Sequence, residues 1–151
     1  MRAVVQRVQK TSLRVDGQLI SEIPFGLTVF LGVKTGDTEK EAAYLAKKIA
    51  GLRIFEDENG KMNLSLLDVG GEMLVISNFT LLAAYKKGNR PDYMGAAKPA
   101  EAKTLYEYFS ESCRRYVPVE CGIFGADMKV DIENDGPVTI VMDSKVLLGR
   151  L

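Results

Sequence analysis

The residues best suited to chemistry begin with Ser77, Asn78, Phe79 and Thr80, near the end of an apolar segment that runs from residue 72 to residue 82. Hydroxyls and freed main-chain N–H groups at a strand end can stabilise the negative oxygen that forms when an ester is hydrolysed. In a continuous strand, Ser77 and Phe79 would share one face, and Asn78 and Thr80 the other. The bare pattern also fits a strand passing from core to edge, with its hydroxyls bonded to neighbouring backbone.

A second segment, Asn134-Asp135-Gly136-Pro137-Val138-Thr139, combines turn-forming residues with a Gly-Pro bond. One interpretation is a simple turn between two strands. The functional alternative starts from the fact that X-Pro bonds are among the few that can be cis. A cis bond would point the Gly136 carbonyl outward, and a ligand could approach this backbone closely because Gly136 has no Cβ.

The segment from Tyr85 to Tyr93 is basic, with Lys86, Lys87 and Arg90 interleaved with a glycine. It could be an ordinary solvated loop. The alternative is a nucleic-acid contact, with cations on phosphates and aromatic rings stacked on bases. Because the formal net charge of the chain is zero, RNA would have to be held by such a local patch and not by the field of the whole protein.

The absence of histidine from all 151 residues excludes several kinds of active site. There can be no Ser-His-Asp or Cys-His catalytic group and no histidine-held metal. The two cysteines, Cys113 and Cys121, are expected in a helix and a strand as small apolar residues, not as a disulfide framework or a metal site. We expect no metal and no cofactor, so any hydrolysis must depend on other groups.

The elements that must position these segments are mostly strands, with two main helices. Hydrophobic spacing and turn residues predict the strands. A capping box at Thr38 and Glu41 and a first-turn proline at Pro99 predict the helices. The expected strands cover 3–15, 18–23, 26–33, 52–55, 72–82, 119–123, 126–133 and 138–143, and the expected helices cover 38–50 and 99–113.

Hydrophobic residues make up 46% of the chain and charged residues 26%, with no linker or repeat, which is typical of one globular domain. We therefore expect a single α/β domain over residues 1–151, with a β-barrel-like or mixed-sheet core covered by two main helices. The first eight residues alternate charge and apolarity and do not resemble a signal peptide, and no apolar run reaches membrane-spanning length. We expect a cytoplasmic protein with no membrane contact.

Taken together, these segments resemble the D-aminoacyl-tRNA deacylase (D-tyrosyl-tRNA deacylase) family, in the same order and at about the expected separations. The family's signature motifs are Ser-Gln-Phe-Thr and Asn-x-Gly-Pro-Val-Thr. The resemblance covers essentially the whole chain, and it also rests on MRAVVQRV at 1–8, GLRIFEDENGKMN at 51–63, KGNRP at 87–91 and FGADM at 124–128.

The resemblance implies roles for individual residues. The second motif matches fully, whereas in the first Asn78 stands where Gln is usual and is one methylene shorter. Smaller departures are Ala84, in place of a polar residue, and Asp92-Tyr93, in place of a Ser-Phe pair. The implied catalytic residues are Ser77, Phe79 and Thr80, and the implied substrate-binding residues are Asn78, Gly136, Pro137, Met128, Lys86, Lys87 and Arg90.

The resemblance also implies the substrate and the assembly. The expected reaction is hydrolysis of the ester of D-aminoacyl-tRNA to free tRNA and amino acid, with the acceptor end and terminal adenosine of the tRNA bound. The family is homodimeric, with its active sites at the subunit interface. A cis Gly136-Pro137 bond of one subunit would enter the active site of its partner.

On this basis the main-chain N–H groups near Phe79 and Thr80 would stabilise the oxyanion, with Ser77 supporting the loop. Because no histidine can act as a base for Thr80, we expect attack by water, helped by the 2′-hydroxyl of the tRNA, and not a covalent route. The Gly136 and Pro137 carbonyls would bind the substrate amino group and leave no room for an L side chain. Such a filter should accept many D-amino acids and also glycyl-tRNA, because glycine has no Cβ.

Two other functions stay open at this level. A tRNA- or nucleotide-binding module without catalysis would keep the fold and the basic loop, and Asn78 is the one feature that supports it. A conventional serine or threonine hydrolase of small esters is disfavoured by the lack of histidine.

Overall fold

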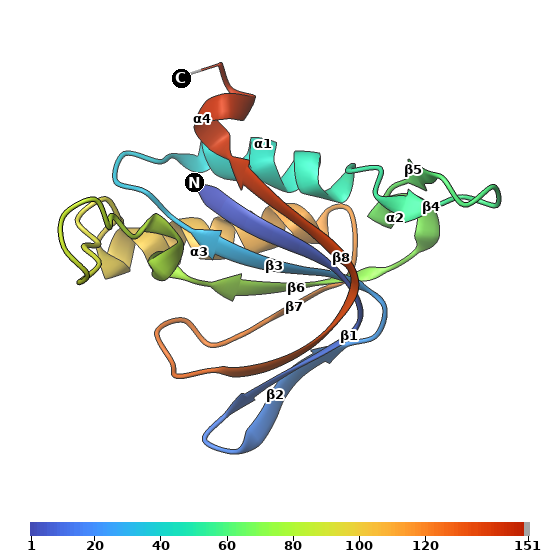
Figure 1. The fold of residues 1–151 in the computed structure, drawn as a ribbon, viewed down its shortest axis with the longest axis horizontal. Helices are drawn as coiled ribbons and strands as arrows, with labels where there is room; N and C mark the ends of the chain where they lie inside the picture. Colours follow the sequence, from blue (N-terminus) through green and yellow to red (C-terminus); the bar gives the residue numbers. More distant parts are fainter. Residues whose placement is uncertain (150–151) are drawn as a thin grey trace.

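The central feature of the computed structural model, which describes residues 1–149, is a strongly curved mixed sheet (Figure 1). Its hydrogen-bonded order is β2-β1-β3-β6-β7, and β8 pairs with the other edge of β1. These strands are β1 (Arg2–Val15), β2 (Gln18–Ile23), β3 (Gly26–Gly32), β6 (Glu72–Ser77), β7 (Val119–Cys121) and β8 (Lys129–Asp143). A separate hairpin pairs β4 (Phe55–Glu56) with β5 (Met62–Leu64).

Two long helices, α1 (Glu39–Ala50) and α3 (Pro99–Arg114), pack on one face of this sheet (Figure 1). Shorter helical segments are α2 (Leu66–Val69), α4 (Ser144–Leu147) and the 3₁₀ turn η1 (Phe79–Leu82). The predicted α/β fold, a barrel-like mixed sheet with two main helices, is confirmed. No helix in residues 1–149 is both long enough and apolar enough to cross a bilayer.

The sheet buries apolar side chains on both of its faces, because neighbouring residues of a strand point in opposite directions. Val29 and Val75 belong to the larger cluster, which the sheet shares with Leu45 and Phe109 of the two long helices. The concave side of the sheet holds a smaller cluster of Val8, Leu13, Ile23, Leu74 and Ile76. The chain thus has a rigid double-faced scaffold on which to mount a site.

Local signals in the sequence explain several element boundaries. Asp16 and Gly17 both have positive φ, as a two-residue hairpin turn between β1 and β2 requires. Thr38 caps α1 through the predicted capping box with Glu41, and Pro99 occupies the first turn of α3. These hydrogen bonds and the fixed φ of proline set where each helix starts.

The cysteines lie where the sequence predicts, one in a helix and one in a strand. Cys113 is buried in α3 and Cys121 is half-buried at the end of β7, and both are free thiols. Burial raises the pKa of the Cys113 thiol. A neutral buried thiol behaves as a small apolar side chain.

Four predicted strands differ from the structure. Residues 52–54 are not in a strand. The predicted strand 72–82 ends at Ser77, because Asn78 caps the 3₁₀ turn that follows. The two predicted strands 126–133 and 138–143 form one strand, β8, whose two halves both pair with β1. Residues 134–137 are therefore not a reversing turn. The early end of β6 and the joining of the last two strands both fall in the segments singled out for chemistry.

Candidate active site

The segment Ser77–Thr80 forms a tight corner where β6 ends. Ser77 is the last residue of β6 in register with Leu31 of β3, and the Asn78 N–H still donates to the Leu31 carbonyl at 2.8 Å. The 3₁₀ turn then begins at Phe79. Since the first N–H groups of any helix lack an intrahelical acceptor, this corner presents main-chain donors beside the exposed Phe79 and Thr80.

The side chain of Asn78 folds back over this corner. Its carboxamide oxygen accepts a hydrogen bond from the Thr80 N–H at 3.1 Å and another from the Thr80 hydroxyl. Asn78 and Thr80 are thus joined side chain to side chain. The alternation expected for a continuous strand, with Ser77 and Phe79 on one face, is wrong here because the strand has already ended.

The far end of the turn is held by Arg2. One guanidinium nitrogen donates to the Leu81 carbonyl at 3.1 Å, and another lies 3.3 Å from Asp143, which also binds Lys34 at 2.5 Å. Partial burial alone would raise the pKa of Asp143, but the hydrogen bonds from Lys34 and the Lys145 N–H outweigh it and lower the pKa overall. The carboxylate therefore stays charged and fixes Arg2 against the turn.

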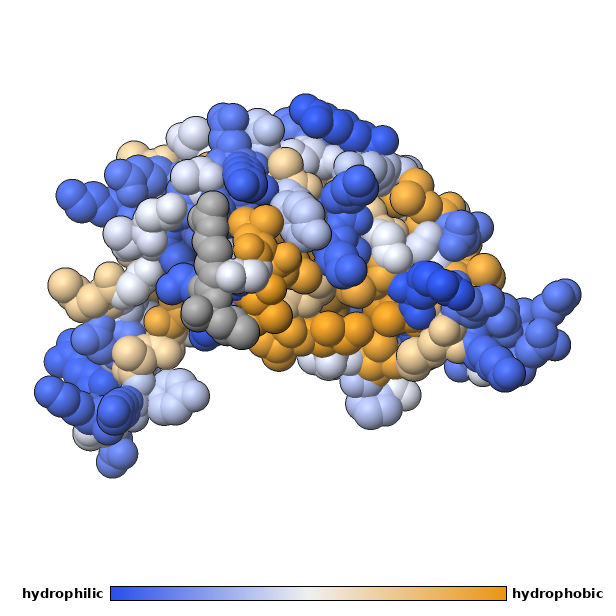
Figure 2. Space-filling model, turned by 90° about the horizontal axis from the view of Figure 1, so that it is seen from above, coloured by the Kyte–Doolittle hydropathy of each residue, from blue (hydrophilic) through white to orange (hydrophobic). Residues whose placement is uncertain are grey.

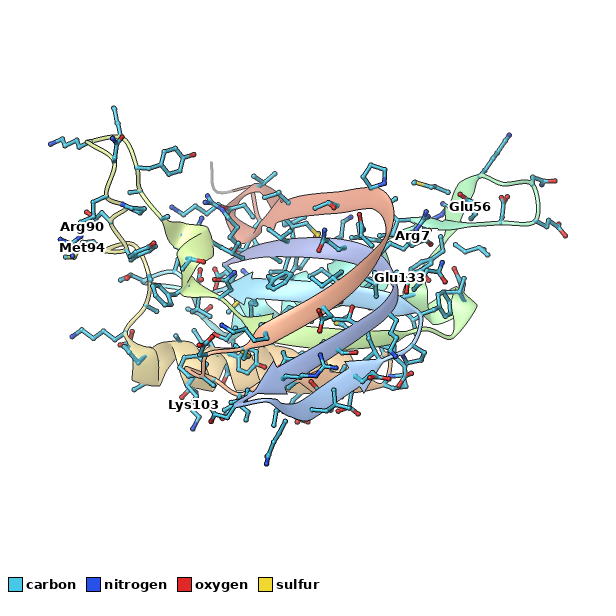
Figure 3. All side chains as sticks on the ribbon, turned by 60° about the horizontal axis from the view of Figure 1, so that its bottom comes forward. Arg7, Glu56, Arg90, Met94, Lys103 and Glu133 are labelled. Carbon is cyan, nitrogen blue, oxygen red and sulfur yellow. The ribbon has the colours of Figure 1, made fainter. Side chains whose placement is uncertain are left out.

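The basic loop lies beside the same corner. The ring of Phe79, which is 57% exposed, packs edge-on against Tyr93 with ring centroids 5.1 Å apart. Paired main-chain hydrogen bonds between Ala84 and Asp92 close the base of the loop. Arg90 and Met94 project from it at one end of the molecule (Figure 3).

The cations of this loop are available to a partner. Lys86, Lys87 and Arg90 are exposed, and within residues 1–149 none of them is in an ion pair. The structure thus joins the first motif to the basic loop through Phe79 and Tyr93, and the three cations project into solvent from that loop.

Gly136 and Pro137 lie where β8 leaves its ladder with β1. Gln6 pairs with Thr139 and Val8 with Asn134, so residues 135–138 stand opposite Arg7 alone without register partners. Both Gly136 and Pro137 are exposed, and the bond between them is cis, as predicted. A Cβ on Gly136 would lie 2.4 Å from the Asn134 side-chain oxygen and 2.4 Å from the Val138 nitrogen, so any side chain here would force the loop to shift.

Two side chains brace this loop. Arg7, only 7% exposed, donates to the Asp135 carbonyl at 3.1 Å and to the Ile54 carbonyl at 2.7 Å, and it lies 3.1 Å from the Asp135 carboxylate. Asn134 donates to the Arg7 carbonyl at 2.9 Å and to the Val138 carbonyl at 3.2 Å. The residues on either side of Gly136-Pro137 are therefore fixed to the sheet.

The two signature segments do not meet within one chain. The Ser77–Thr80 corner is tied to Arg2 and the Gly136-Pro137 loop to Arg7, and these residues are five positions apart on β1. At the rise of an extended strand that is about 16 Å. In Figure 3, Arg7 lies on the side of the sheet toward Glu56, away from Arg90 and Met94.

Met128 lies just before β8, half-buried against the concave-side cluster that includes Ile76, the neighbour of Ser77. A Cβ on Gly122 would come within 2.6 Å of the Met128 sulfur, so this side chain sits directly on the backbone that follows β7. Among residues 1–149 no three histidine, cysteine, aspartate or glutamate side chains gather as metal ligands.

An open hollow lies beside Arg2, the residue that holds the far end of the turn. A hollow of about 640 Å³ is lined by the cations Arg2, Lys34 and Lys145 together with Val141 and Val146. These two valines are 67% and 57% exposed. Figure 2, which looks onto this part of the molecule, shows apolar residues in a continuous band between hydrophilic ends.

Sequence reasoning missed the bracing residues Arg2 and Arg7, and it missed the contact of Tyr93 with Phe79. Arg7 carried a usable signal, because it shares its strand parity with the buried Ala3 and Val5 and therefore points into the core. A buried guanidinium needs acceptors, so its presence indicated a braced loop. The partners of Arg2 and Tyr93 lie far away in sequence, and no local pattern reveals them.

Comparison of the sequence with known proteins gives one consistent family. A family model described as D-Tyr-tRNA(Tyr) deacylase matches residues 4–143. Proteins named D-aminoacyl-tRNA deacylase from a Sulfurihydrogenibium species and from Persephonella marina are 58% and 56% identical, each over 97% of this chain and 100% of the relative. A relative of the same name from Bacillus cytotoxicus is 55% identical over 96% of this chain and 100% of its own length.

Solved structures give the same result. The c-Myc DNA Unwinding Element Binding Protein superposes with a TM-score of 0.90 at 45% identity, covering 95% of this chain and 98% of the other. A probable eukaryotic D-amino acid tRNA deacylase has a TM-score of 0.80 at 16% identity, over 93% of this chain and 97% of the other, and so shares the fold. By its sequence and its structure, the chain belongs to the D-Tyr-tRNA(Tyr) deacylase family.

Proposed function

We propose that this protein hydrolyses the ester of D-aminoacyl-tRNA and releases free tRNA and the amino acid. Family membership and near-full-length relatives of that name support the reaction. The observation that carries the proposal is the corner after β6, where the 3₁₀ turn offers main-chain donors beside an exposed aromatic ring and a loop of unpaired cations.

The chemistry needs only modest assistance, because an aminoacyl ester is already reactive. The N–H groups of Phe79 and Thr80 stabilise the negative oxygen that develops on the ester carbonyl, and Ser77 supports the corner. With no histidine in the chain, Thr80 has no conventional base. Water is therefore the nucleophile, assisted by the 2′-hydroxyl of the terminal adenosine.

The complete site forms between two copies of the chain. Arg2, which holds the catalytic corner, and Arg7, which holds the Gly136-Pro137 loop, lie about 16 Å apart along β1, so we infer that a second copy supplies the loop. The surface offers the features of an interface. Within residues 1–149, β1 is the only strand that pairs with β8, and the exposed Val141 and Val146 lie near the end of β8.

Chirality is read by main chain. The carbonyls of Gly136 and Pro137 accept hydrogen bonds from the substrate amino group and leave no space where an L side chain would project. The braces from Arg7 and Asn134 support this role, because they hold the loop at both of its ends. A D side chain points away from the protein, so one site serves many D-amino acids.

Three charged tRNAs test the reaction and the filter together. We expect rapid hydrolysis of D-tyrosyl-tRNA, measurable hydrolysis of glycyl-tRNA and no acceleration with L-tyrosyl-tRNA, because the filter excludes only an L-oriented Cβ. Release of the labelled amino acid over time measures all three. Refusal of glycyl-tRNA would show that the filter reads more than sterics. Binding of D-tyrosyl-tRNA without cleavage would indicate a tRNA-binding module that is not an enzyme. Cleavage of free small esters would indicate a general hydrolase.

The basic loop holds the acceptor end of the tRNA through its phosphates. We expect the combined change Lys86→Gln, Lys87→Gln and Arg90→Gln to raise KM about tenfold or more with little loss of kcat, and to flatten the fall of activity with salt. Steady-state kinetics at several salt concentrations provide the measurement. Neutralising the exposed Lys40, Lys47 and Lys48 of α1 removes the same charge elsewhere, and an equal effect there would count against a role for the loop.

A further inference from the structure

The carboxamide oxygen of Asn78 occupies a position that suits a substrate oxygen. Both donors of Thr80, its N–H at 3.1 Å and its hydroxyl, converge on this single atom. Within residues 1–149, by contrast, the Phe79 N–H has no hydrogen-bond acceptor. One of the two main-chain donors at the corner is therefore occupied and the other is open.

We propose that Asn78 is a latch that sets how many oxyanion donors this site offers. In the resting chain the Asn78 oxygen holds the Thr80 N–H, and the developing negative oxygen of the substrate displaces it. This inference rests on the oxyanion role proposed above for the Phe79–Thr80 corner. It adds a positioning residue whose side chain competes with the substrate for a main-chain donor.

The competition follows from side-chain length. Asparagine is among the best N-cap residues because its oxygen reaches the N–H two residues ahead, and Asn78 is the N-cap of the turn. Glutamine is one methylene longer and is not a preferred N-cap residue, so it leaves the Thr80 N–H free. An asparagine at position 78 therefore changes donor availability without altering the main chain.

The latch can open because the surroundings are open. Asn78 is half-buried, and Thr80 is exposed to solvent. A negatively charged oxygen forms a stronger hydrogen bond than a neutral carboxamide, so the transition state favours displacement. The ground-state ester carbonyl is neutral and competes less well. The rate of every turnover is lowered in proportion to the fraction of molecules in which Asn78 holds the Thr80 N–H.

Two substitutions with opposite expected signs test the latch. Asn78→Gln frees the Thr80 N–H and should raise kcat/KM for D-tyrosyl-tRNA about fivefold, since N-cap hydrogen bonds hold their donors with equilibrium constants of that order. Asn78→Asp keeps the shape and the cap but adds a negative charge beside the oxyanion. It should lower kcat/KM tenfold or more with an unchanged melting temperature.

A purely structural cap predicts the reverse pattern. Glutamine would then lower activity by loosening the turn, and aspartate, an equally good cap, would leave activity unchanged. Either result would overturn the proposal. Amide hydrogen exchange gives a readout separate from activity. The Thr80 amide should exchange more slowly in the parent protein than in Asn78→Gln, and equal exchange in the two proteins would also overturn the latch.

Failure of the latch can be told apart from failure of the proposed function. If the parent protein hydrolyses D-tyrosyl-tRNA and Asn78→Gln is no faster, the latch is wrong and the deacylase function stands. Phe79→Pro removes the Phe79 N–H at a position where helices tolerate proline, and Phe79→Ala is its control because it keeps the N–H. If both variants have the kcat of the parent protein, the oxyanion role of the corner is wrong.

Discussion

Gly136→Ala is expected to lower kcat/KM for D-tyrosyl-tRNA by about 100-fold or more while changing the melting temperature little. The new methyl would lie 2.4 Å from the Asn134 side-chain oxygen and 2.4 Å from the Val138 nitrogen. The exposed loop can shift to relieve this contact, but its carbonyls then leave their positions, and a displacement of about 1 Å at a reacting centre costs about 100-fold in rate. Single-turnover deacylation and thermal unfolding measure the two effects.

Gly95→Ala is a matched control, because a Cβ there meets nothing within 4 Å and the backbone has no positive φ. Mixed dimers would test the proposed sharing of each site between two subunits more directly. Gly136→Ala and Phe79→Pro damage different segments, so mixed dimers of the two variants keep one intact site if each site draws on both subunits. Random exchange should restore about a quarter of the parent sites. No recovery after proven exchange would place both segments in one chain's site.

Arg7→Ala is expected to lower both stability and activity. The guanidinium serves the carbonyls of Ile54 and Asp135 from a side chain that is only 8% exposed. Its removal leaves these acceptors without their donor, at a cost of about 3 kcal/mol in the free energy of unfolding. The Gly136-Pro137 loop also loses a brace, so kcat should fall together with stability. Urea titration and kinetics on folded protein measure both.

Arg14→Ala on the same strand is the natural comparison. Its side chain is 44% exposed and makes one surface ion pair with Asp131, so we expect a loss below about 1 kcal/mol. Arg7→Lys retains the charge but cannot donate to the Ile54 and Asp135 carbonyls at the same time. Its free energy of unfolding and its kcat should lie between those of the parent and those of Arg7→Ala. Full activity of Arg7→Ala at a temperature where it is folded would show that the brace has no part in the reaction.

Most of the fold was predictable because its signals are local. The hairpin at Asp16-Gly17 follows from the residue types of the turn. The first residues of α1 and α3 follow from a capping box and a first-turn proline. The two-faced core follows from alternating apolar residues. None of these features needs knowledge of a distant partner, which is why residues 1–50 match the expected elements closely.

The predictions failed where tertiary contacts override local signals. Asn134 to Pro137 have the composition of a reversing turn. However, β1 is long enough to pair with both halves of β8, so the chain continues in the same direction past these residues. Similarly, the apolar residues after Ser77 suggest a longer strand. The Asn78 cap and the Arg2 contact with Leu81 hold them as a 3₁₀ turn instead.

For the site, residue identities came from family resemblance, whereas the spatial relations came only from the structure. The sequence could not indicate that the first segment and the basic loop touch through Phe79 and Tyr93. Nor could it indicate that the Gly136-Pro137 loop lies against the middle of β1, five residues beyond the Arg2 that holds the other segment. Such distances depend on strand register, which is set by pairing partners remote in the chain.

The hydrogen bonds that hold the Gly136-Pro137 loop determine which substitutions around it can be tolerated in evolution. Four hydrogen bonds that hold the loop end on main-chain oxygens, those of Ile54, Asp135, Arg7 and Val138. A carbonyl acceptor survives any change of codon, so positions 54 and 138 are free to vary among apolar residues. Selection falls on the two donors, Arg7 and Asn134, and on the missing side chain of Gly136. Substitutions at these three positions should therefore damage the loop more than apolar exchanges at positions 54 and 138.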